Sequence, residues 1–386
     1  MPNIWRHIYR GLLAFCVLVT LTLGLVVATH FTEIEKAIRA YTLIYFQSLE
    51  PANTDKLLEG VIKGMVDALD DPYSSYLNAE TYERLKESVA GTYGGVGLLI
   101  TVDEKGRLIV VSPFKGTPAQ RAGIKSEDCI IAIDGQDTMN MDLETAASLM
   151  QGEPGTTVEL TIQSAGSEGT RKVSLERELI KVPTVEGEML SQQAGIGYIS
   201  LTMFNEQTAT DLGQQLQELR QQGMERLILD LRNNPGGSLP AAIDVASYFI
   251  PEGPVVYIAD QKKMEAMQAR GYGQLMPLVV LVNKGSASAA EIVAGAIKDT
   301  KAGILVGETT FGKGIVQTVF PLPEETAVKI TTHKYLTPAK NDIHKVGIEP
   351  DYQVPLDPQL EFQVLSNAPN LELDPQLQKA FSLLTE

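Results

Sequence analysis

Cysteine is nearly absent from this chain of 386 residues, in which only Cys16 and Cys129 occur. Two cysteines, one of them inside an apolar run, cannot build a disulfide framework. Cys129 lies in the apolar stretch CIIAI, which favours a small buried hydrophobic residue over a catalytic thiol. Histidine is scarce as well: the chain has four, and His7 and His30 belong to its N-terminal segment. Imidazole catalysis therefore has few candidates.

Positive charge is also in short supply, with 32 Lys and Arg residues against 48 Asp and Glu residues and a net charge of -16. Such a balance repels phosphate backbones and anionic lipid surfaces. We expect no nucleic-acid partner and no membrane association beyond the N-terminal segment. The length and the 44% hydrophobic content predict two or three domains with packed cores.

The N-terminus carries the longest apolar run. Arg6 and Arg10 precede residues 11–29 (GLLAFCVLVTLTLGLVVAT), which hold no charge. At about 1.5 Å per residue this run nearly matches a hydrocarbon core of roughly 30 Å, so residues 1–30 are predicted to be a removed signal peptide or a membrane anchor. Either form places the remainder in the periplasm or another extracytoplasmic space.

Residues 31–90 have helical periodicity, with apolar positions spaced for one helix face. Asp70, Asp71 and Pro72 interrupt the pattern, and TYERLKESV predicts one more short helix. We interpret this segment as a helical arm. It would serve interdomain or homodimer contacts, or else form a simple cap on the core.

In residues 91–178 the pattern predicts short strands separated by glycines, with one helix at 143–150. Glycines before the first strand let successive backbone N–H groups turn toward one point, a nest that suits a carboxylate. A peptide would add as an extra strand, with its last side chain in an apolar groove. The predicted peptide-binding residues are Gly94, Gly95, Val96, Gly97, Leu98, Ile100, Ala146 and Met150. Together with SPFKGTPAQRAGIKSEDCIIAIDG, this order of features resembles a bacterial PDZ domain.

Residues 179–356 alternate between apolar strands and helices, a pattern typical of an α/β domain with a mostly buried sheet. Residues 357–386 are predicted to be a polar tail with one short helix around FSLL.

Small residues occupy the junction between the strand PLVVLVN and the helix that follows it. Ser288 would sit on a tight turn there, with the N–H of Ala289 and the helix N-terminus available to an oxyanion. Capping of the helix by Ser286 and Ser288 is the alternative. A second junction after RLILDL offers an N–H from Gly236 or Gly237, and two donors make a working oxyanion hole.

A serine hydroxyl needs a base, and neither His333 nor His344 has a flanking pattern that suggests a site with Asp230. Lys313 lies between two glycines in a mostly apolar segment. Burial would lower its pKa from about 10.4, as a base at neutral pH requires. Gln317 would share a strand face with Lys313 and orient it. For an isolated GKG, a surface lysine in a glycine-rich loop would be the better interpretation.

The motifs DLRNNPGG, VLVNKGSASAAE and GETTFGKGIVQ follow the PDZ-like module in this order. Together they closely resemble the carboxyl-terminal processing proteases, also called tail-specific proteases. The resemblance implies an α/β protease core with an inserted β-rich PDZ-like domain and an N-terminal helical arm. The implied activity is that of a serine endopeptidase that recognises free, apolar C-termini of protein or peptide substrates.

The resemblance also implies roles for individual residues. Ser288 is the acylating nucleophile, Lys313 the general base and Gln317 the residue that positions the lysine, while Ala289 and Gly236 or Gly237 form the oxyanion hole. No metal or organic cofactor is implied.

The sequence departs from many relatives at Gln151, where they carry an arginine that couples PDZ occupancy to activation. Ala290 likewise replaces a serine. Two rival functions are a non-catalytic PDZ scaffold with an inert core and an acyl-CoA enzyme with a similar oxyanion hole, although the second explains neither the PDZ-like module nor the export segment.

Overall fold

The computed structural model describes residues 13, 17 and 29–386, apart from 104, 165, 168, 192, 193, 274, 366 and 367. Arg6, Arg10 and most of the apolar run of the predicted export segment lie outside these residues, so the export prediction stays a prediction. Within the described part of the chain, no helix is long and apolar enough to cross a membrane. The chain divides into two compact units, Met1–Tyr76 and Leu77–Glu386, and β1 (Ser75–Leu77) runs across their boundary.

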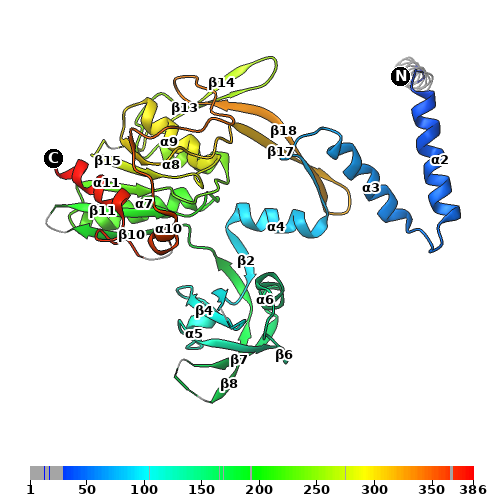
Figure 1. Cartoon of the computed structure of the whole chain (residues 1–386), viewed down its shortest axis with the longest axis horizontal. Helices are drawn as coiled ribbons and strands as arrows, with labels where there is room; N and C mark the ends of the chain where they lie inside the picture. Colours follow the sequence, from blue (N-terminus) through cyan, green and yellow to red (C-terminus); the bar gives the residue numbers. More distant parts are fainter. Residues whose placement is uncertain are drawn as a thin grey trace, which may run out of the picture. The chain divides into compact units, whose positions relative to one another are not determined.

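The first unit is helical, as the periodicity predicted. It contains α2 (Phe31–Gln47) and α3 (Thr54–Asp67), drawn in blue in Figure 1. Asn53 begins α3 by accepting a hydrogen bond from the backbone N–H of Lys56 at 3.0 Å. Apolar side chains such as Ile38 and Phe46 are largely exposed. The homodimer contact through this arm stays a prediction.

The second unit begins with α4 (Ala79–Ala90), which Asn78 caps and which ends at Gly91 in the left-handed conformation (φ 72°). A two-stranded ribbon of β2 (Thr92–Gly95) and β9 (Glu178–Lys181) then frames the PDZ-like module. The sheet of the module has the order β3-β4-β5-β7-β8, and β3 lies at its edge. Its elements are β3 (Leu98–Val102), β4 (Leu108–Pro113), α5 (Pro118–Arg121), β5 (Cys129–Ile133), β6 (Gln136–Asp137), α6 (Leu143–Met150), β7 (Thr157–Gln163) and β8 (Thr170–Glu176).

A six-stranded sheet with the order β10-β11-β12-β15-β16-β19 forms the centre of the α/β core. Only β10 is antiparallel to its neighbour. All five residues of β15, LVVLV, are buried because both faces of the sheet are covered. The strands are β10 (Val185–Ser191), β11 (Ile196–Leu201), β12 (Arg226–Asp230), β15 (Leu278–Val282), β16 (Ile304–Gly307) and β19 (Tyr352–Gln353).

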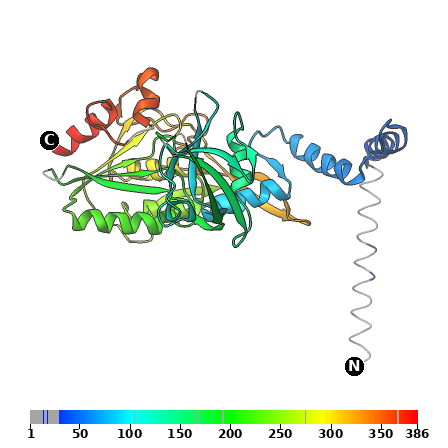
Figure 2. The ribbon, with the colours of Figure 1, turned by 90° about the horizontal axis from the view of Figure 1, so that it is seen from below.

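Helices cover the two faces of this sheet. One face packs on α7 (Thr208–Gln221), α8 (Leu239–Ala246) and α9 (Ala289–Asp299), and the other packs on α11 (Pro375–Thr385). Figure 2 shows the red C-terminal helices and the green α7 on opposite sides of the sheet. The α/β prediction for the core is therefore confirmed, and the loops at the carboxyl ends of β12 and β15 meet at one edge, where open α/β sheets place their ligands.

Two strands near the end of the α/β core belong to a sheet separate from the central one. β17 (Ile315–Leu322) and β18 (Thr326–Leu336) form an antiparallel hairpin, and β18 also pairs with β13 (Pro254–Ala259), which pairs with β14 (Met264–Gln268). Most residues of β17 are only partly buried, so their apolar content does not require two covered faces. The sequence also failed to indicate β10, β13, β14 and the helix α10 (Pro358–Leu365).

Candidate active site

The turn between β15 and α9 carries both candidate serines, and they differ in their surroundings. Ser286 is buried: its Oγ donates to the carbonyl oxygen of Leu231 at 2.7 Å and accepts from the N–H of Asn283 at 3.0 Å. Ser288 lines a cleft and has φ 53° and ψ -113°, a conformation that non-glycine residues rarely adopt. Ser286 therefore holds the turn together, while Ser288 is presented on a strained backbone.

A buried carboxylate, Glu291, joins the serine turn to the segment that contains the lysine. Its Oε2 accepts the backbone N–H groups of Ser288 and Lys313, each at 2.9 Å. Its Oε1 accepts the Thr310 hydroxyl at 2.6 Å and the Gly312 N–H at 2.7 Å. Four donors to one ionised group make charge-assisted hydrogen bonds, the strong kind. The two segments are thus fixed to each other through a single side chain.

Tyr335 of β18 adds a further contact to the serine turn. Its hydroxyl donates to the backbone carbonyl oxygen of Ser288 at 3.1 Å. Burial, together with the negative charge of Glu291, raises the pKa of the Tyr335 hydroxyl well above its usual range. The phenol therefore stays protonated and keeps its proton for this hydrogen bond.

The second glycine junction lies against the serine turn. The Asn234 carbonyl oxygen accepts from the N–H of Ala287 at 2.9 Å, and the Asn234 Oδ1 accepts from the N–H of Gly236 at 2.8 Å. A Cβ at Gly236 would lie 2.8 Å from the backbone nitrogen of Ala289, so only glycine permits this approach. Gly237 and Ala289 both line the cleft, and neither N–H has an acceptor among the described residues. Of the two glycines, Gly237 has the free donor.

Lys313 is half-buried just before β17 and lines the same cleft. Burial and the like charge of Lys329 lower the pKa of the Lys313 amine, and Glu291 opposes them in part. Gln317 also lines the cleft, and its Nε2 donates to the Thr331 Oγ1 at 3.4 Å. The strand register shifts between positions 316 and 317, so simple alternation from residue 313 is not why the two side chains share the cleft.

Lys329 offers a test of the lysine pKa. Replacing it with methionine removes a positive charge and therefore raises the pKa of the Lys313 amine. If the deprotonated Lys313 is the base, the rise of kcat/KM with pH should move to higher pH, and activity at pH 7 should fall. The measurement is a pH profile of kcat/KM for wild type and Lys329→Met.

A matched control for this profile is Lys334→Met on the same strand, where an exposed lysine pairs with Asp342. Its profile should coincide with that of the wild type. A Lys329→Met profile that stays in place, or that moves to lower pH, would contradict the assignment of Lys313 as the base.

The cleft has a volume of about 790 Å³ and combines polar and apolar walls. Ser288, Ala289, Lys313 and Gln317 meet there with Gly237. Apolar lining comes from Phe204, Leu239, Ile292 and Val316, and from Tyr82 and Leu85 of α4. Such a cleft accommodates an extended peptide backbone beside apolar side chains.

The alternative triad is not assembled around Asp230. That carboxylate accepts the Tyr198 hydroxyl at 2.7 Å and pairs with the Arg232 guanidinium. His333 instead contacts the adjacent Thr332 hydroxyl through its Nδ1 at 2.7 Å. Among the described residues, no group of three His, Cys, Asp or Glu side chains is arranged to hold a metal ion.

The predicted peptide-binding residues lie along the edge strand β3 and helix α6. Val96, Leu98, Ala146 and Met150 are buried in the core of the module, whereas Ile100 is partly exposed. Gly94 and Gly95 belong to β2, and Gly97 has φ 77° just before β3 begins. The Arg177 side chain donates to the carbonyl oxygens of Leu149 and Met150 at the end of α6, next to Gln151.

Sequence reasoning missed three residues at this site: Glu291, Tyr335 and Lys329. For Glu291 a signal was available, because a serine followed three residues later by glutamate is the capping-box pattern. Nothing in the local sequence marks Tyr335 or Lys329, whose roles depend on where β18 lies. The buried Cys129, as expected, is a free thiol, and burial raises its pKa.

A serine on a strained strand-to-helix turn, beside a half-buried lysine and a PDZ-like module, has the arrangement of a serine peptidase. Comparisons with known proteins agree. Residues 195–354 match Peptidase family S41, residues 109–164 match a PDZ domain, and residues 24–81 match the N-terminal domain of the activating protease CtpB.

Relatives that match over most of the chain agree with this family. The chain is 42% identical over 327 residues to a carboxyl-terminal-processing protease of a Picosynechococcus species, covering 83% of this chain and 78% of the relative. It is 39% identical over 333 residues to the carboxy-terminal processing protease CtpA of Bacillus subtilis, covering 85% and 70%. The chain belongs to the carboxyl-terminal processing proteases of Peptidase family S41 and is a serine-type peptidase.

Solved structures support the fold. The photosystem II D1 C-terminal processing protease is similar with a TM-score of 0.50 at 36% identity, covering 80% of this chain and 85% of that one. An S41 protease from Bacteroides fragilis is similar with a TM-score of 0.54 at 16% identity, covering 82% and 87%, and this likeness concerns the fold alone.

Proposed function

We propose that this peptidase captures the free C-terminus of a protein substrate in its PDZ module and hydrolyses the chain with a Ser288/Lys313 dyad. The observation that carries the proposal is the shared Glu291 oxygen, which binds the backbone N–H groups of both dyad residues. A common anchor for two segments distant in sequence is what a preorganised nucleophile and base require.

The dyad performs both halves of the reaction. Lys313 takes the hydroxyl proton as the Ser288 Oγ adds to the scissile carbonyl carbon, and the N–H groups of Gly237 and Ala289 stabilise the oxyanion. The protonated lysine then gives its proton to the leaving amine. Water attacks the acyl-enzyme ester in the second half, again with Lys313 as base, and releases the new C-terminus. Gln317 orients the lysine.

Substrate capture uses the edge of the PDZ sheet. Because β3 is the edge strand of the sheet formed by the described residues, a substrate tail can add to it as a strand, with its carboxylate at the N–H groups around Gly97. The tail then lies against α6, where Ile100 offers a partly exposed apolar surface. The relatives are named for processing at the carboxyl terminus. These names agree with capture of a substrate by its C-terminal end.

The test is cleavage of an unfolded protein that ends in an apolar, free C-terminus, compared with the same protein ending in an amide. The full chain in detergent is incubated with each, and binding and cleavage are measured separately. Hydrogen bonds to a charged group contribute about 1.5–3 kcal/mol, so the amide should bind roughly tenfold to a hundredfold more weakly. Equal affinity for acid and amide would remove carboxylate capture from the proposal.

The non-catalytic scaffold makes the opposite prediction in the same assay. It requires that free tails bind and that no cleavage follows. The complete arrangement of Ser288, Lys313 and Gln317 around one cleft favours the peptidase.

A further inference from the structure

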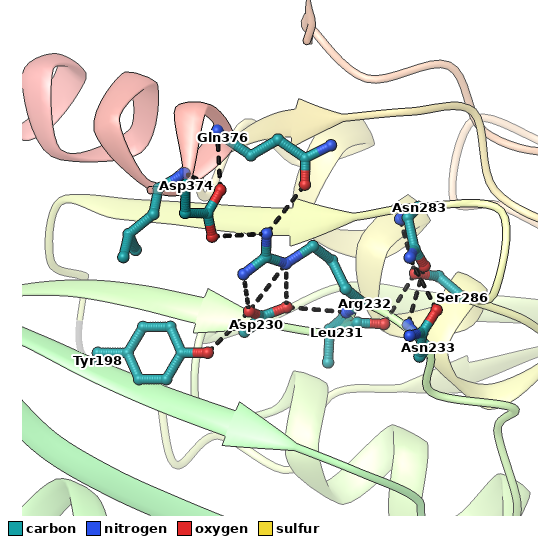
Figure 3. A network of polar contacts seen from close by, with 10 residues as sticks. Tyr198, Asp230, Leu231, Arg232, Asn233, Asn283, Ser286, Asp374 and Gln376 are labelled. Carbon is teal, nitrogen blue, oxygen red and sulfur yellow. Dashed lines mark hydrogen bonds and ion pairs between the residues drawn. The ribbon is translucent and has the colours of Figure 1, made fainter. Parts of the chain in front are cut away.

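The buried guanidinium of Arg232 lies behind the catalytic cleft, and the mechanism above does not use it. The side chain is only 4% exposed. Its Nε donates to both carboxylate oxygens of Asp230, at 3.0 and 2.9 Å. Its Nη1 donates to the Asp374 Oδ2 at 2.8 Å and to the Gln376 Oε1 at 3.0 Å. Figure 3 shows Arg232 between Asp230 and the first turn of α11.

The charges in this network depend on one another. Burial lowers the pKa of the Arg232 guanidinium, but the neighbouring carboxylates of Asp230 and Asp374 raise it by more, so the side chain stays charged. Asp374 is itself 4% exposed and also caps α11, since its Oδ1 accepts from the N–H groups of Gln376 and Leu377. Removing one partner of a buried ion pair leaves an uncompensated charge, which is strongly unfavourable.

Arg232 connects directly to the oxyanion-hole turn. The next residue, Asn233, has φ 55° and exchanges two hydrogen bonds of 2.8 Å with the side chain of Asn283, its N–H donating to Oδ1 and its Oδ1 accepting from Nδ2. The preceding carbonyl oxygen, of Leu231, accepts the Ser286 hydroxyl. Both turns of the site are therefore attached to the backbone on either side of Arg232, as Figure 3 shows.

The partners of Arg232 on α11 come from the C-terminal segment, beyond residues 195–354 that match the peptidase family. Helix α11 covers one face of the sheet through Leu377, Ala380 and Leu384. The network also borders a cavity of about 570 Å³ that Val364 and Leu365 of α10 line. The C-terminal segment thus packs against the Arg232 network.

We propose that Asp374 and Gln376 are positioning residues, which hold the oxyanion-hole turn in its working geometry through Arg232. This proposal rests on the function proposed above. Without the Asp374 carboxylate, the Arg232 guanidinium has one anionic partner fewer and shifts toward Asp230. The backbone of the oxyanion-hole turn, which begins at Arg232, shifts with it. Misplacement of reacting groups by about 1 Å costs on the order of a hundredfold in rate, whereas substrate binding in the PDZ groove and the cleft is unaffected.

The experiment compares Asp374→Ser with wild type in the full chain. Serine still caps α11 but cannot reach Arg232 as an anion. Gln376→Met is a milder variant that removes no charge: it removes the neutral acceptor of Arg232 and the Nε2 donor to the Val354 carbonyl oxygen, and it is expected to fold if Asp374→Ser does not. Gln378→Ala is the matched control on the same helix, because the exposed Gln378 side chain donates to the Leu371 carbonyl oxygen and contributes nothing to the Arg232 network described above.

Two readouts separate positioning from general damage. The first is kcat against KM on a cleaved peptide, measured well below the unfolding temperature of each variant. The second is inhibition by a substrate-like peptide aldehyde, whose adduct with Ser288 places an oxygen in the oxyanion hole, against the corresponding alcohol, which forms no adduct. We expect Asp374→Ser to lose about tenfold to a hundredfold in kcat and a similar factor in aldehyde affinity, with KM and alcohol affinity within about twofold of wild type. Gln376→Met should lose about threefold to tenfold in kcat, and Gln378→Ala nothing.

Folded variants with wild-type kcat and aldehyde affinity would overturn the proposal. So would equal weakening of aldehyde and alcohol, which would indicate a general loss of structure. Failure of the proposed function has a different signature, in which the wild type does not cleave or Ser288→Ala still cleaves.

Discussion

The Ser288→Ala variant is expected to lose at least about 10³-fold in kcat for peptide cleavage, since loss of a nucleophile leaves only the contribution of the oxyanion hole and of substrate binding. Ser286 cannot take over, because its Oγ is buried and donates to the Leu231 carbonyl oxygen. The measurement is single-turnover cleavage of a labelled peptide with a free apolar C-terminus. The variant should bind that peptide as tightly as the wild type does.

The control for this variant is Ser174→Ala, which removes an exposed hydroxyl from β8 of the PDZ module. Its activity should equal that of the wild type. Cleavage by Ser288→Ala at more than about a tenth of the wild-type rate would mean that another residue attacks the substrate.

Glu291→Gln is the second variant with a large expected effect. The amide keeps the size of the side chain but turns one oxygen into an NH₂ group, which then faces N–H donors such as those of Ser288 and Lys313. We expect kcat to fall by about a hundredfold, because the two segments lose their common anchor. Hydrogen bonds to a buried charge are also lost, so the free energy of unfolding should fall by roughly 3 kcal/mol.

Glu308→Gln provides the comparison, since Glu308 lies nearby in sequence but pairs with the exposed Lys284 at 3.2 Å. The Glu308 side chain is only 17% exposed, but its partner Lys284 is 81% exposed, and ion pairs open to solvent contribute about 0–1 kcal/mol. Chemical denaturation and steady-state kinetics on both variants give the two quantities. Wild-type kcat in a folded Glu291→Gln protein would show that the shared carboxylate does not align the dyad.

The features that local sequence could predict are those set by local chemistry. Small residues around Ser288 indicated a tight turn, and the glycines around Lys313 indicated an unusual lysine; family resemblance paired the two. The buried strands β11, β12, β15 and β16 of the central sheet followed from their apolar runs, as in LVVLV of β15. The site assignments themselves remain predictions until the variants are measured.

Features that depend on distant contacts escaped prediction. The capping-box pattern marks Glu291 as a partner of Ser288, but only the fold brings Thr310 and Gly312 to it. Asp374 and Gln376 belong to a polar segment, and nothing local indicates that a buried arginine lies opposite. The separate sheet of β17 and β18 also could not be predicted, because apolar content alone does not distinguish an edge or partly covered strand from a central one.

Lys329 has a consequence for which peptide bonds are cut quickly. An acidic substrate side chain that lies beside Lys329 neutralises its charge, and the proton affinity of Lys313 then rises. At neutral pH a smaller fraction of Lys313 would then be deprotonated and able to act as the base of the proposed dyad, even though the acidic charge attracts the substrate into the cleft. Discrimination against acidic residues near the cleaved bond should therefore appear as a lower kcat, with KM unchanged or lower. The enzyme would thus distinguish one substrate sequence from another through the pKa of the Lys313 amine as well as through direct contacts.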